Sequence, residues 1–393
     1  MIPKEGYMAG IRDYSPQKAV EISFPKAGCS YYDPVFGNKV YRVTDENHGT
    51  QCVHYYYWSP VFNCDETKML IFRDWNPWIF NFNDGEAKPA FSLCDVDGAP
   101  RMNAMSAQWT KANPDVLFTL DDGNVIYRID VTAGQATQYR SFQAELPGYK
   151  LDELNMADSG LWYSFRGTGP NGEEVACVWD RQTDGIRTFP KPIQSGVHST
   201  QISRDGQWLT VYGSYPVAET AFWRWADGHI EWIYDTDRTP HGNVNHIYDG
   251  RSVIVGGYAP TNGICTRRWE DFNTVTQIFP FTKPDGTDNW SMAHHVVARG
   301  PYESSVICST YGGDGNAGTN EIIEIPTNGS SFRRLAHTYS AGKDGNYTGD
   351  NYWRQPRANV SPSGRWAVWT SDLGQEDRTD VLCMELPPDA LNL

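Results

Sequence analysis

Side chains suited to acid–base chemistry or metal binding recur just ahead of seven short turns in the sequence. They include six of the nine histidines, since only His48, His229 and His337 lie elsewhere. Histidine titrates near neutral pH and can exchange protons during catalysis, and its ring nitrogens also bind divalent metals. The full set is His54, Tyr56, Asn103, Asp152, Asn155, His198, His241, Asn245, His246, His294, His295, Arg357 and Asn359. Polar residues at strand starts can equally satisfy backbone groups or bind water, and that alternative stays open.

His294 and His295 are the candidate metal ligands, with Mn or Ca as the divalent metal if one is bound. Adjacent residues of a strand point to opposite faces, so only one of the two can face a shared site. His295 is preferred because it lies five residues ahead of the turn at Gly300. No spacing decides between metal binding and acid–base chemistry. The sequence has no P-loop, dinucleotide-binding, G-x-S-x-G or H-E-x-x-H motif, so it does not support nucleotide-binding, hydrolase-elbow or zincin sites.

Aromatic side chains are dense near the same positions, in a chain with 15 Trp and 22 Tyr. Packing between strands explains most of them. Those on loops, especially Trp75, Trp78 and Trp353, offer flat faces on which sugar rings can stack. For these loop residues a sugar-stacking platform is therefore the alternative to packing.

The elements that must position these residues follow from a repeat. Seven segments share a strand, a tight turn of the S-x-D-G type and a second strand, with further hairpins between them. The turns are marked by Glu66, Pro114, Gly160, Gly206, Gly250, Gly300 and Gly364, so their spacings are 48, 46, 46, 44, 50 and 64 residues. This is the length of a four-stranded blade and predicts an all-β, seven-bladed propeller formed by residues 1–393 as a single domain. The innermost strands then begin at one mouth of a central channel.

Two further features concern the ends of the repeat. The strand KVYRVTD precedes the first blade without a partner, and TDVLCMELP ends the last, so pairing of N-terminal and C-terminal strands is predicted to close the ring. The alternative of two β-sandwiches needs a break in the period, and none occurs. The long last interval contains the insertion HTYSAGKDGNYTGDNYWRQP, expected as a loop on the face where the innermost strands begin.

Charge and hydropathy limit the partners. The net charge of −15, from 33 basic and 48 acidic residues, disfavours nucleic acid and anionic membrane surfaces. No run approaches the ~18 apolar residues of a membrane span. Eight cysteines without a C-x-x-C pair are expected as free thiols, mostly buried. A cytoplasmic location is favoured, and a secreted or periplasmic one follows if a signal peptide was removed.

Several stretches resemble the seven-bladed propeller polysaccharide lyases, in particular the oligogalacturonate lyases, which cleave uronate chains by β-elimination. They are VYRVTD, CVHYYYWSPVFNCDETKMLIF, VHSTQISRDG, AETAFWRWADG, NHIYDG, MAHHVVARG and PRANVSPSGRWAVWTSDLG. The resemblance implies that His246 matches the family's catalytic histidine and that His294 or His295 matches a metal ligand.

This chain also departs from that pattern. The family's His-x-His pair that completes a manganese site is replaced by Arg357 and Asn359, and its catalytic arginine falls near Ala221, with Arg224 the nearest substitute. Other propeller lyases, such as those resembling the ulvan-degrading and rhamnose-glucuronate families, work without a catalytic metal, using His or Tyr as base and Arg to neutralise the uronate carboxylate. Arg357 fits that second scheme.

The sequence thus predicts a lyase acting on a uronate-containing oligo- or polysaccharide. The expected roles are base for His246 or His198, acid for Tyr56 and carboxylate clamp for Arg357. The expected substrate contacts are His54, Asn155, His241, Asn245, Asn359, Trp75 and Trp353. A non-catalytic sugar- or protein-binding propeller and a propeller glycoside hydrolase remain as alternatives.

Overall fold

The computed structural model describes most of the chain in fourteen ranges. These are 19–102, 106–193, 196–213, 219–234, 243–248, 251–258, 263–268, 271–281, 294–299, 305–311, 318–329, 331–340, 349–375 and 377–388. Within them the side chains of a few residues, His246 among them, fall outside the description. All structural statements below concern these ranges.

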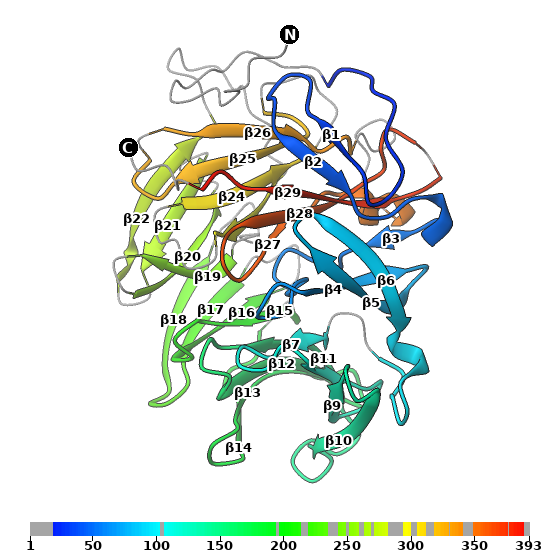
Figure 1. Ribbon diagram of the computed structural model, residues 1–393. Coiled ribbons are helices and arrows are strands. Elements are labelled where there is room, and N and C mark those ends of the chain that lie inside the picture. The colour runs from blue at the N-terminus through cyan, green and yellow to red at the C-terminus, as the bar shows by residue number, and fades with distance from the viewer. Residues whose placement is uncertain are drawn as a thin grey trace.

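Seven antiparallel sheets form the seven blades of a propeller, as the turn spacing predicts (Figure 1). The first four are β3(Cys52–Val53)–β4(Lys68–Arg73)–β5(Asn76–Asn83)–β6(Glu86–Ser92), β7(Gln108–Trp109)–β8(Val116–Leu120)–β9(Val125–Asp130)–β10(Gln135–Ser141), β11(Lys150–Met156)–β12(Trp162–Thr168)–β13(Glu174–Asp180)–β14(Gly185–Thr188) and β15(Val197–Ile202)–β16(Trp208–Gly213)–β17(Glu219–Arg224)–β18(His229–Tyr234). Two more are β19(Asn243–Tyr248)–β20(Arg251–Tyr258)–β21(Gly263–Arg268)–β22(Asp271–Pro280) and β23(His294–Ala298)–β24(Ser305–Thr310)–β25(Glu321–Pro326)–β26(Arg333–His337). All seven predicted turn markers fall between the first and second strands of a sheet. Contacts join the first strands of blades two to seven in ring order, from β7 through β11, β15, β19 and β23 to β27(Asn359–Val360), so these strands lie on the inner side of the ring.

The seventh blade joins the two ends of the chain. Its order is β27(Asn359–Val360)–β28(Trp366–Ser371)–β29(Asp380–Glu385)–β2(Lys39–Arg42)–β1(Ser30–Tyr32). The predicted closure is confirmed, because β2 pairs with β29 in the register Tyr41↔Cys383 (Figure 1, blue beside red). Strand β1 adds a fifth strand that the sequence pattern did not predict. The described ranges also include three short 3₁₀ helices, η1(Glu46–His48), η2(Leu93–Asp95) and η6(Gly349–Arg354).

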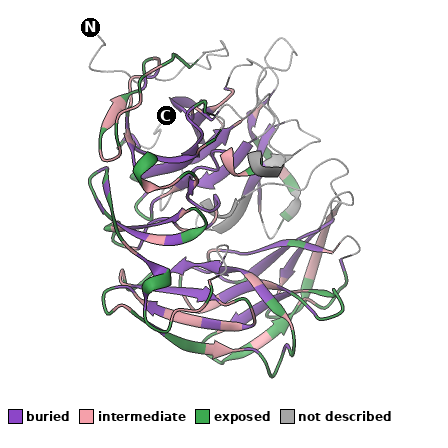
Figure 2. Cartoon of the chain, turned by 90° about the vertical axis from the view of Figure 1, so that its right-hand side faces the viewer, coloured by how far each residue is buried: buried purple, intermediate pink, exposed green. Residues whose placement is uncertain are grey.

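The core consists of apolar clusters between neighbouring blades. One cluster, for example, joins Leu70 and Ile79 of blade one to Trp109 and Leu117 of blade two. Alternation along each strand sends one face to each neighbour, so the strands are mostly buried, and exposed residues gather in turns and outer strands (Figure 2). None of the helices in the described part of the chain has the length and apolar character of a membrane span.

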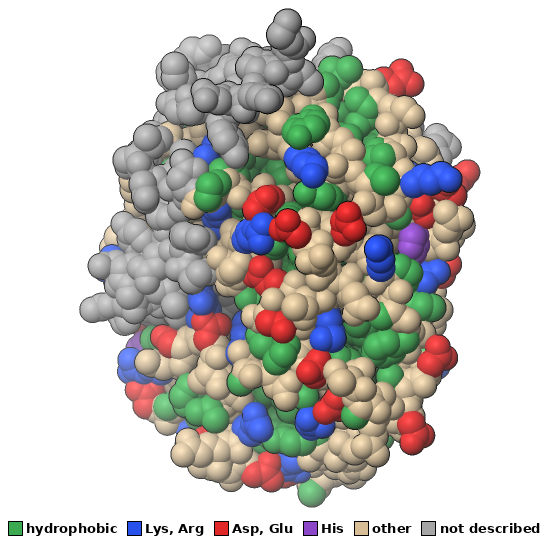
Figure 3. Space-filling model, in the orientation of Figure 1, with side chains coloured by type: hydrophobic (Ala, Val, Ile, Leu, Met, Phe, Trp, Pro, Cys, Tyr) green, Lys and Arg blue, Asp and Glu red, His purple; other side chains and the backbone are tan. Residues whose placement is uncertain are grey.

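On the face drawn in Figure 3, Lys and Arg side chains are interspersed with Asp and Glu, so the acidic excess does not form one patch there.

All eight cysteines are free, and five of them are buried. The expectation of free, mostly buried thiols is confirmed.

Candidate active site at the propeller mouth

The innermost strand of blade one is interrupted. Val53 pairs with Phe72, and pairing resumes only at the bridge between Phe62 and Met69. Residues 54–61 therefore oppose only residues 70–71, and we call 54–61 the channel segment. A continuous inner strand was expected here, but eight residues opposite two cannot remain in register, so the segment leaves the sheet.

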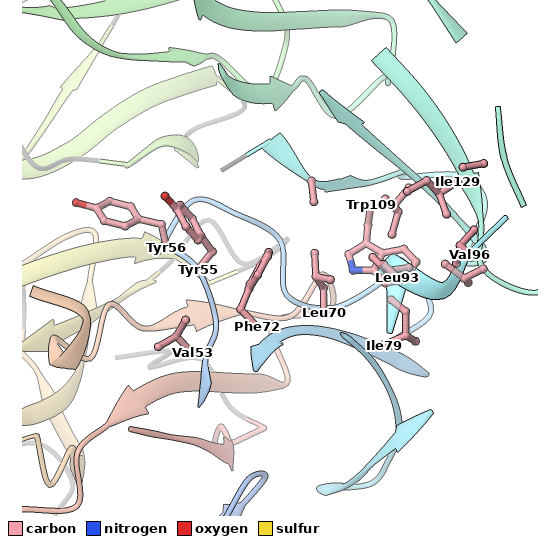
Figure 4. Close-up of a cluster of buried hydrophobic side chains, with 14 of the residues drawn as sticks. Val53, Tyr55, Tyr56, Leu70, Phe72, Ile79, Leu93, Val96, Trp109 and Ile129 are labelled. Carbon is pink, nitrogen blue, oxygen red and sulfur yellow. The ribbon is translucent and has the colours of Figure 1, made fainter. Parts of the chain in front are cut away.

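The channel segment fills the centre of the propeller with aromatic rings. The ring of Tyr57 lies 5.1 Å from that of His295 in blade six, and Tyr57 hydrogen-bonds Gln201 in blade four. Figure 4 shows Tyr55 and Tyr56 at one end of a buried cluster that passes Leu93 and Trp109 and reaches Val96 and Ile129 at the other. One short segment of blade one thus contacts both blade four and blade six.

His54 and Asn359 hold this segment in place. The His54 Nε2–H donates to the carbonyl oxygen of Arg357 at 2.7 Å, so its Nδ1 accepts from the Thr370 hydroxyl at 3.0 Å. Burial lowers the pKa of His54 to about 4, which keeps the ring neutral. Asn359 Nδ2 donates to the carbonyl oxygens of Tyr57 and Ser59 at 2.8 and 3.0 Å. These bonds give both residues a positioning role, and their direct contact with substrate stays a prediction.

Arg357 is a buried cation without an acidic partner. It is 1% exposed, and no carboxylate in the described part of the chain pairs with it. Its guanidinium carbon lies 4.0 Å from the ring centroid of Tyr352 and 5.0 Å from that of Tyr56. Its Nη2 donates to the Tyr352 carbonyl and to Gln355 Oε1, whereas its buried Nε has no hydrogen-bond partner among the described residues.

The electrostatic consequence is direct. Burial lowers the pKa of Arg357, because a charge removed from water loses solvation that no carboxylate of the described residues replaces. Such a guanidinium, with an unused N–H, is suited to bind an anion that enters the mouth.

Aromatic side chains form the rim above Arg357. Trp353 in η6 lies 4.8 Å from the Arg357 guanidinium carbon, and its ring contacts Tyr55 at 5.1 Å and Trp75 at 4.9 Å. Trp75 is 44% exposed and Tyr352 37% exposed. The described part of the long insertion thus lies at the mouth as predicted, although it includes a 3₁₀ helix.

The two candidate metal ligands have different surroundings. His295 stacks on Tyr311 with centroids 5.3 Å apart and contacts Tyr56 at 5.6 Å, whereas the ring of His294 lies against Phe281 at 5.1 Å. No three His, Cys, Asp or Glu side chains in the described ranges gather as metal ligands. The uncompensated positive charge of Arg357, which also contacts Tyr56, would repel a divalent cation. The described residues therefore do not fit a metal centre.

Glu153 is a candidate that sequence reasoning missed. The pairing of β11 with β12 shifts between Asp152 and Asn155, and Glu153 has a φ of 54° at this bulge. The bulge turns Glu153 inward, where it is 4% exposed and accepts from the Thr200 N–H at 3.2 Å. Burial raises the pKa of Glu153 to about 7. Its charge also raises the pKa values of Tyr55 and Tyr57, which are raised mainly by burial, so the carboxyl acts on the channel segment.

The other predicted residues of blades three and four surround this bulge. Asn155 Nδ2 donates to the carbonyl oxygens of Glu153 and Thr200 at 3.1 and 3.0 Å, which stabilises the bulge. Asp152 binds Arg166 through both carboxylate oxygens, at 2.7 and 3.0 Å. Arg166 also donates to the carbonyl of His198, whose side chain is exposed. The structure brings none of these residues into contact with Arg357.

Four predicted residues cannot be placed. Asn103 and His241 lie outside the described residues. Asn245 and His246 lie in β19, where the pairing shifts between Asn243 and His246, but their side chains fall outside the description. Their predicted roles stay predictions.

Comparison with known proteins supports the fold. An oligogalacturonate lyase in complex with manganese is similar with a TM-score of 0.67 and 14% identity, covering 93% of this chain and 97% of that one. The oligogalacturonate lyase of Vibrio parahaemolyticus gives 0.65 and 10% identity over 91% and 96%. The hydrazine synthase of Kuenenia stuttgartiensis gives 0.54 and 11% identity over 86% and 97%. No family model and no curated protein sequence matches the chain. At these identities the likeness shows a shared fold alone.

Proposed function

We propose that the protein is a lyase that cleaves a uronate-containing oligo- or polysaccharide by β-elimination at the propeller mouth. The observation that carries the proposal is the buried guanidinium of Arg357, which pairs with no carboxylate of the described residues and lies beneath an aromatic rim. A uronate offers both groups that such a site would bind, a carboxylate and a ring with an apolar face. The likeness in fold to two oligogalacturonate lyases supports a carbohydrate substrate.

Elimination needs three functions from the protein. A base takes the proton from C5, the electrons form the C4–C5 double bond, and the C4–O bond breaks as the leaving oxygen gains a proton. Arg357 neutralises the carboxylate at C5, which stabilises the enolate-like intermediate. His246 or His198 is the proposed base. No step requires a metal.

Tyr56 is the proposed acid. Burial raises its pKa well above the usual value, so the hydroxyl stays protonated at neutral pH and can donate to the leaving oxygen. Its hydroxyl lies 3.0 Å from that of Tyr352, which is partly exposed. Tyr352 can therefore return a proton from solvent to Tyr56 after each turnover.

The test is absorbance near 235 nm after incubation with polygalacturonate, its oligomers and glucuronate-containing polysaccharides, because elimination creates a conjugated double bond. In Arg357→Met, the rate is expected to fall about 100-fold or more, as for loss of one preorganised charge-stabilising group. The thermal midpoint should stay unchanged or rise, since an uncompensated buried charge is removed. Arg365→Met is the matched control, because Arg365 also lies over a tryptophan but its side chain is 49% exposed.

Other outcomes would replace the proposal. New reducing ends without absorbance would indicate a glycoside hydrolase. Uronate binding without any cleavage would indicate a non-catalytic sugar-binding propeller. Full activity in Arg357→Met would contradict the role of Arg357 as the carboxylate clamp.

A further inference from the structure

The hairpin between β4 and β5 has an unusual two-residue turn. Arg73 pairs with Asn76, and between them Asp74 and Trp75 have φ angles of 45° and 67°. Two positive φ angles in a two-residue hairpin indicate a type I′ turn, which strongly favours Asn-Gly or Asp-Gly. A bulky aromatic residue in this left-handed region is an outlier. Trp75 therefore occupies a position that local backbone preferences assign to glycine.

The next hairpin of the same blade shows the favoured solution. Between β5 and β6, Asp84 and Gly85 have φ angles of 50° and 93°, with Asn83 paired to Glu86. The two turns share the aspartate and differ in the second residue. Blade geometry alone thus does not require tryptophan at position 75.

Neighbouring backbone holds the strained turn in one conformation. Asp74 Oδ1 accepts from the Thr50 N–H at 3.0 Å, the Thr50 hydroxyl at 3.0 Å and the Gln51 N–H at 2.9 Å. Backbone strain persists only where surrounding contacts determine the conformation, and it concentrates at ligand-binding sites. These three bonds hold the turn from which the Trp75 side chain projects.

The ring projects at the mouth, next to the Arg357 site. Strand β4 runs antiparallel to β3, so its end lies where the inner strand begins. The Trp75 ring packs edge-on against Trp353 at 4.9 Å and 73°, and Trp353 lies 4.8 Å from the Arg357 guanidinium carbon. One aromatic side chain thus separates the exposed ring from the buried cation.

The size of the exposed aromatic surface indicates the ligand. Trp75 is 44% exposed and Tyr352 37% exposed. Two partly exposed rings offer far less than the several hundred Å² of an apolar protein-docking patch. They match the apolar face of a single sugar ring, and a tryptophan face is suited to stack on it.

We infer that Trp75 is a stacking platform for the sugar unit adjacent to the uronate whose carboxylate Arg357 binds. The ligand must then contain at least two sugar units. This inference rests on the proposed function only for the uronate at Arg357.

The experiment measures how affinity grows with chain length. Binding of galacturonate and of its di- and trisaccharides is measured by calorimetry for the wild type, Trp75→Gly, Trp75→Phe and the control Tyr32→Ser, which alters a 59% exposed aromatic residue of β1. In Trp75→Gly, the gain in affinity from the mono- to the disaccharide should shrink by about 3- to 10-fold, as expected for one lost ring contact. Trp75→Phe and Tyr32→Ser should keep most of this gain in affinity.

Stability gives a second, independent readout. Trp75→Gly creates the favoured Asp-Gly turn, so its thermal midpoint should be unchanged or higher although binding is weaker. If the glycine variant fails to fold, Trp75→Asn serves instead, because asparagine also tolerates left-handed φ. An unchanged gain with chain length in Trp75→Gly or Trp75→Asn, or no gain in the wild type, would overturn the inference.

The two proposals fail separately. Elimination at 235 nm together with an unchanged gain in Trp75→Gly removes only the stacking site. A gain that depends on Trp75 without any elimination removes only the lyase. If the wild type binds no galacturonate of any length, the stacking site is rejected whatever the enzyme assay gives.

Discussion

Two buried ionisable side chains of opposite charge, Glu153 and Arg357, change the pKa of Tyr55 in the channel segment. Burial raises the pKa of Tyr55, the Glu153 carboxyl raises it further and the Arg357 guanidinium lowers it. The backbone φ angles of Glu153 and Arg357 are both positive, at 54° and 45° respectively. Strained backbone and perturbed ionisable groups together are typical of functional sites.

The first prediction concerns Glu153. Its pKa is about 7 in the folded protein, against an ordinary value of 4.5. Between pH 4.5 and pH 7 the folded state therefore binds one proton more at this carboxyl than the unfolded state does. Stability contributed by this group is full below pH 4.5 and is lost as pH rises through 7. The groups that face it are Arg166, Asp152, Ser199, Thr200, Tyr55 and Tyr57.

The variant Glu153→Gln removes the titration and keeps the shape. It should match the wild type near pH 4.5 and exceed its free energy of unfolding at pH 8 by up to about 3 kcal/mol. Urea denaturation at the two pH values measures this. If the difference in free energy of unfolding between Glu153→Gln and the wild type is the same at both pH values, the carboxyl does not titrate in this range.

At the scale of elements, the channel segment depends on blade seven. Asn359 in β27 donates to two carbonyl oxygens of the segment, and His54 at its start donates to the carbonyl of Arg357. The segment and Arg357 therefore keep each other in place. Loss of one of these bonds should displace Tyr56 relative to the guanidinium.

The second prediction tests this coupling with Asn359→Leu. The leucine leaves the carbonyl oxygens of Tyr57 and Ser59 without this donor, which costs about 1–3 kcal/mol for an unsatisfied buried group. Denaturation should show this loss, and the elimination rate should fall although Asn359 need not touch substrate. Asn81→Leu, at an exposed position in β5, is the control. Unchanged stability in Asn359→Leu would contradict the positioning role.

At the scale of the whole molecule, buried ion pairs of Asp380 close the ring of blades together with the pairing of β2 and β29. Asp380 in β29 is fully buried and binds Arg42 of β2 at 2.7 Å and Arg378 at 2.6 Å. It also accepts from the Thr44 hydroxyl at 3.1 Å. One carboxylate thus joins the N-terminal and C-terminal parts of blade seven.

The third prediction is that Asp380→Asn weakens the closure. Two arginines would lose their carboxylate, and removal of one partner of a buried ion pair costs about 3–5 kcal/mol. The urea midpoint should fall accordingly. Glu385→Gln is the control in the same strand, because the exposed pair of Glu385 with Arg365 is worth about 0–1 kcal/mol. Equal effects of the two variants would show that Asp380 does not secure the closure.

What the sequence by itself determined is the repeat. Turn residues such as Gly160, Gly206 and Gly364 and the strand alternation around them depend on local backbone preferences, so they predicted seven blades and the pairing of β2 with β29. The sequence also named Arg357, Trp75 and Trp353 as candidates from their residue types and positions, and their roles stay predictions.

Only the tertiary structure decided what these side chains face. A one-residue bulge turns Glu153 inward against simple alternation, and the channel segment leaves a strand that the pattern made continuous. The turn that contains Trp75 is held by bonds of Asp74 to Thr50 and Gln51, and the guanidinium of Arg357 is buried where the described residues offer it aromatic rings and no carboxylate. Local preferences set the period, whereas burial and charge at the mouth arise from contacts between blades that no single segment encodes.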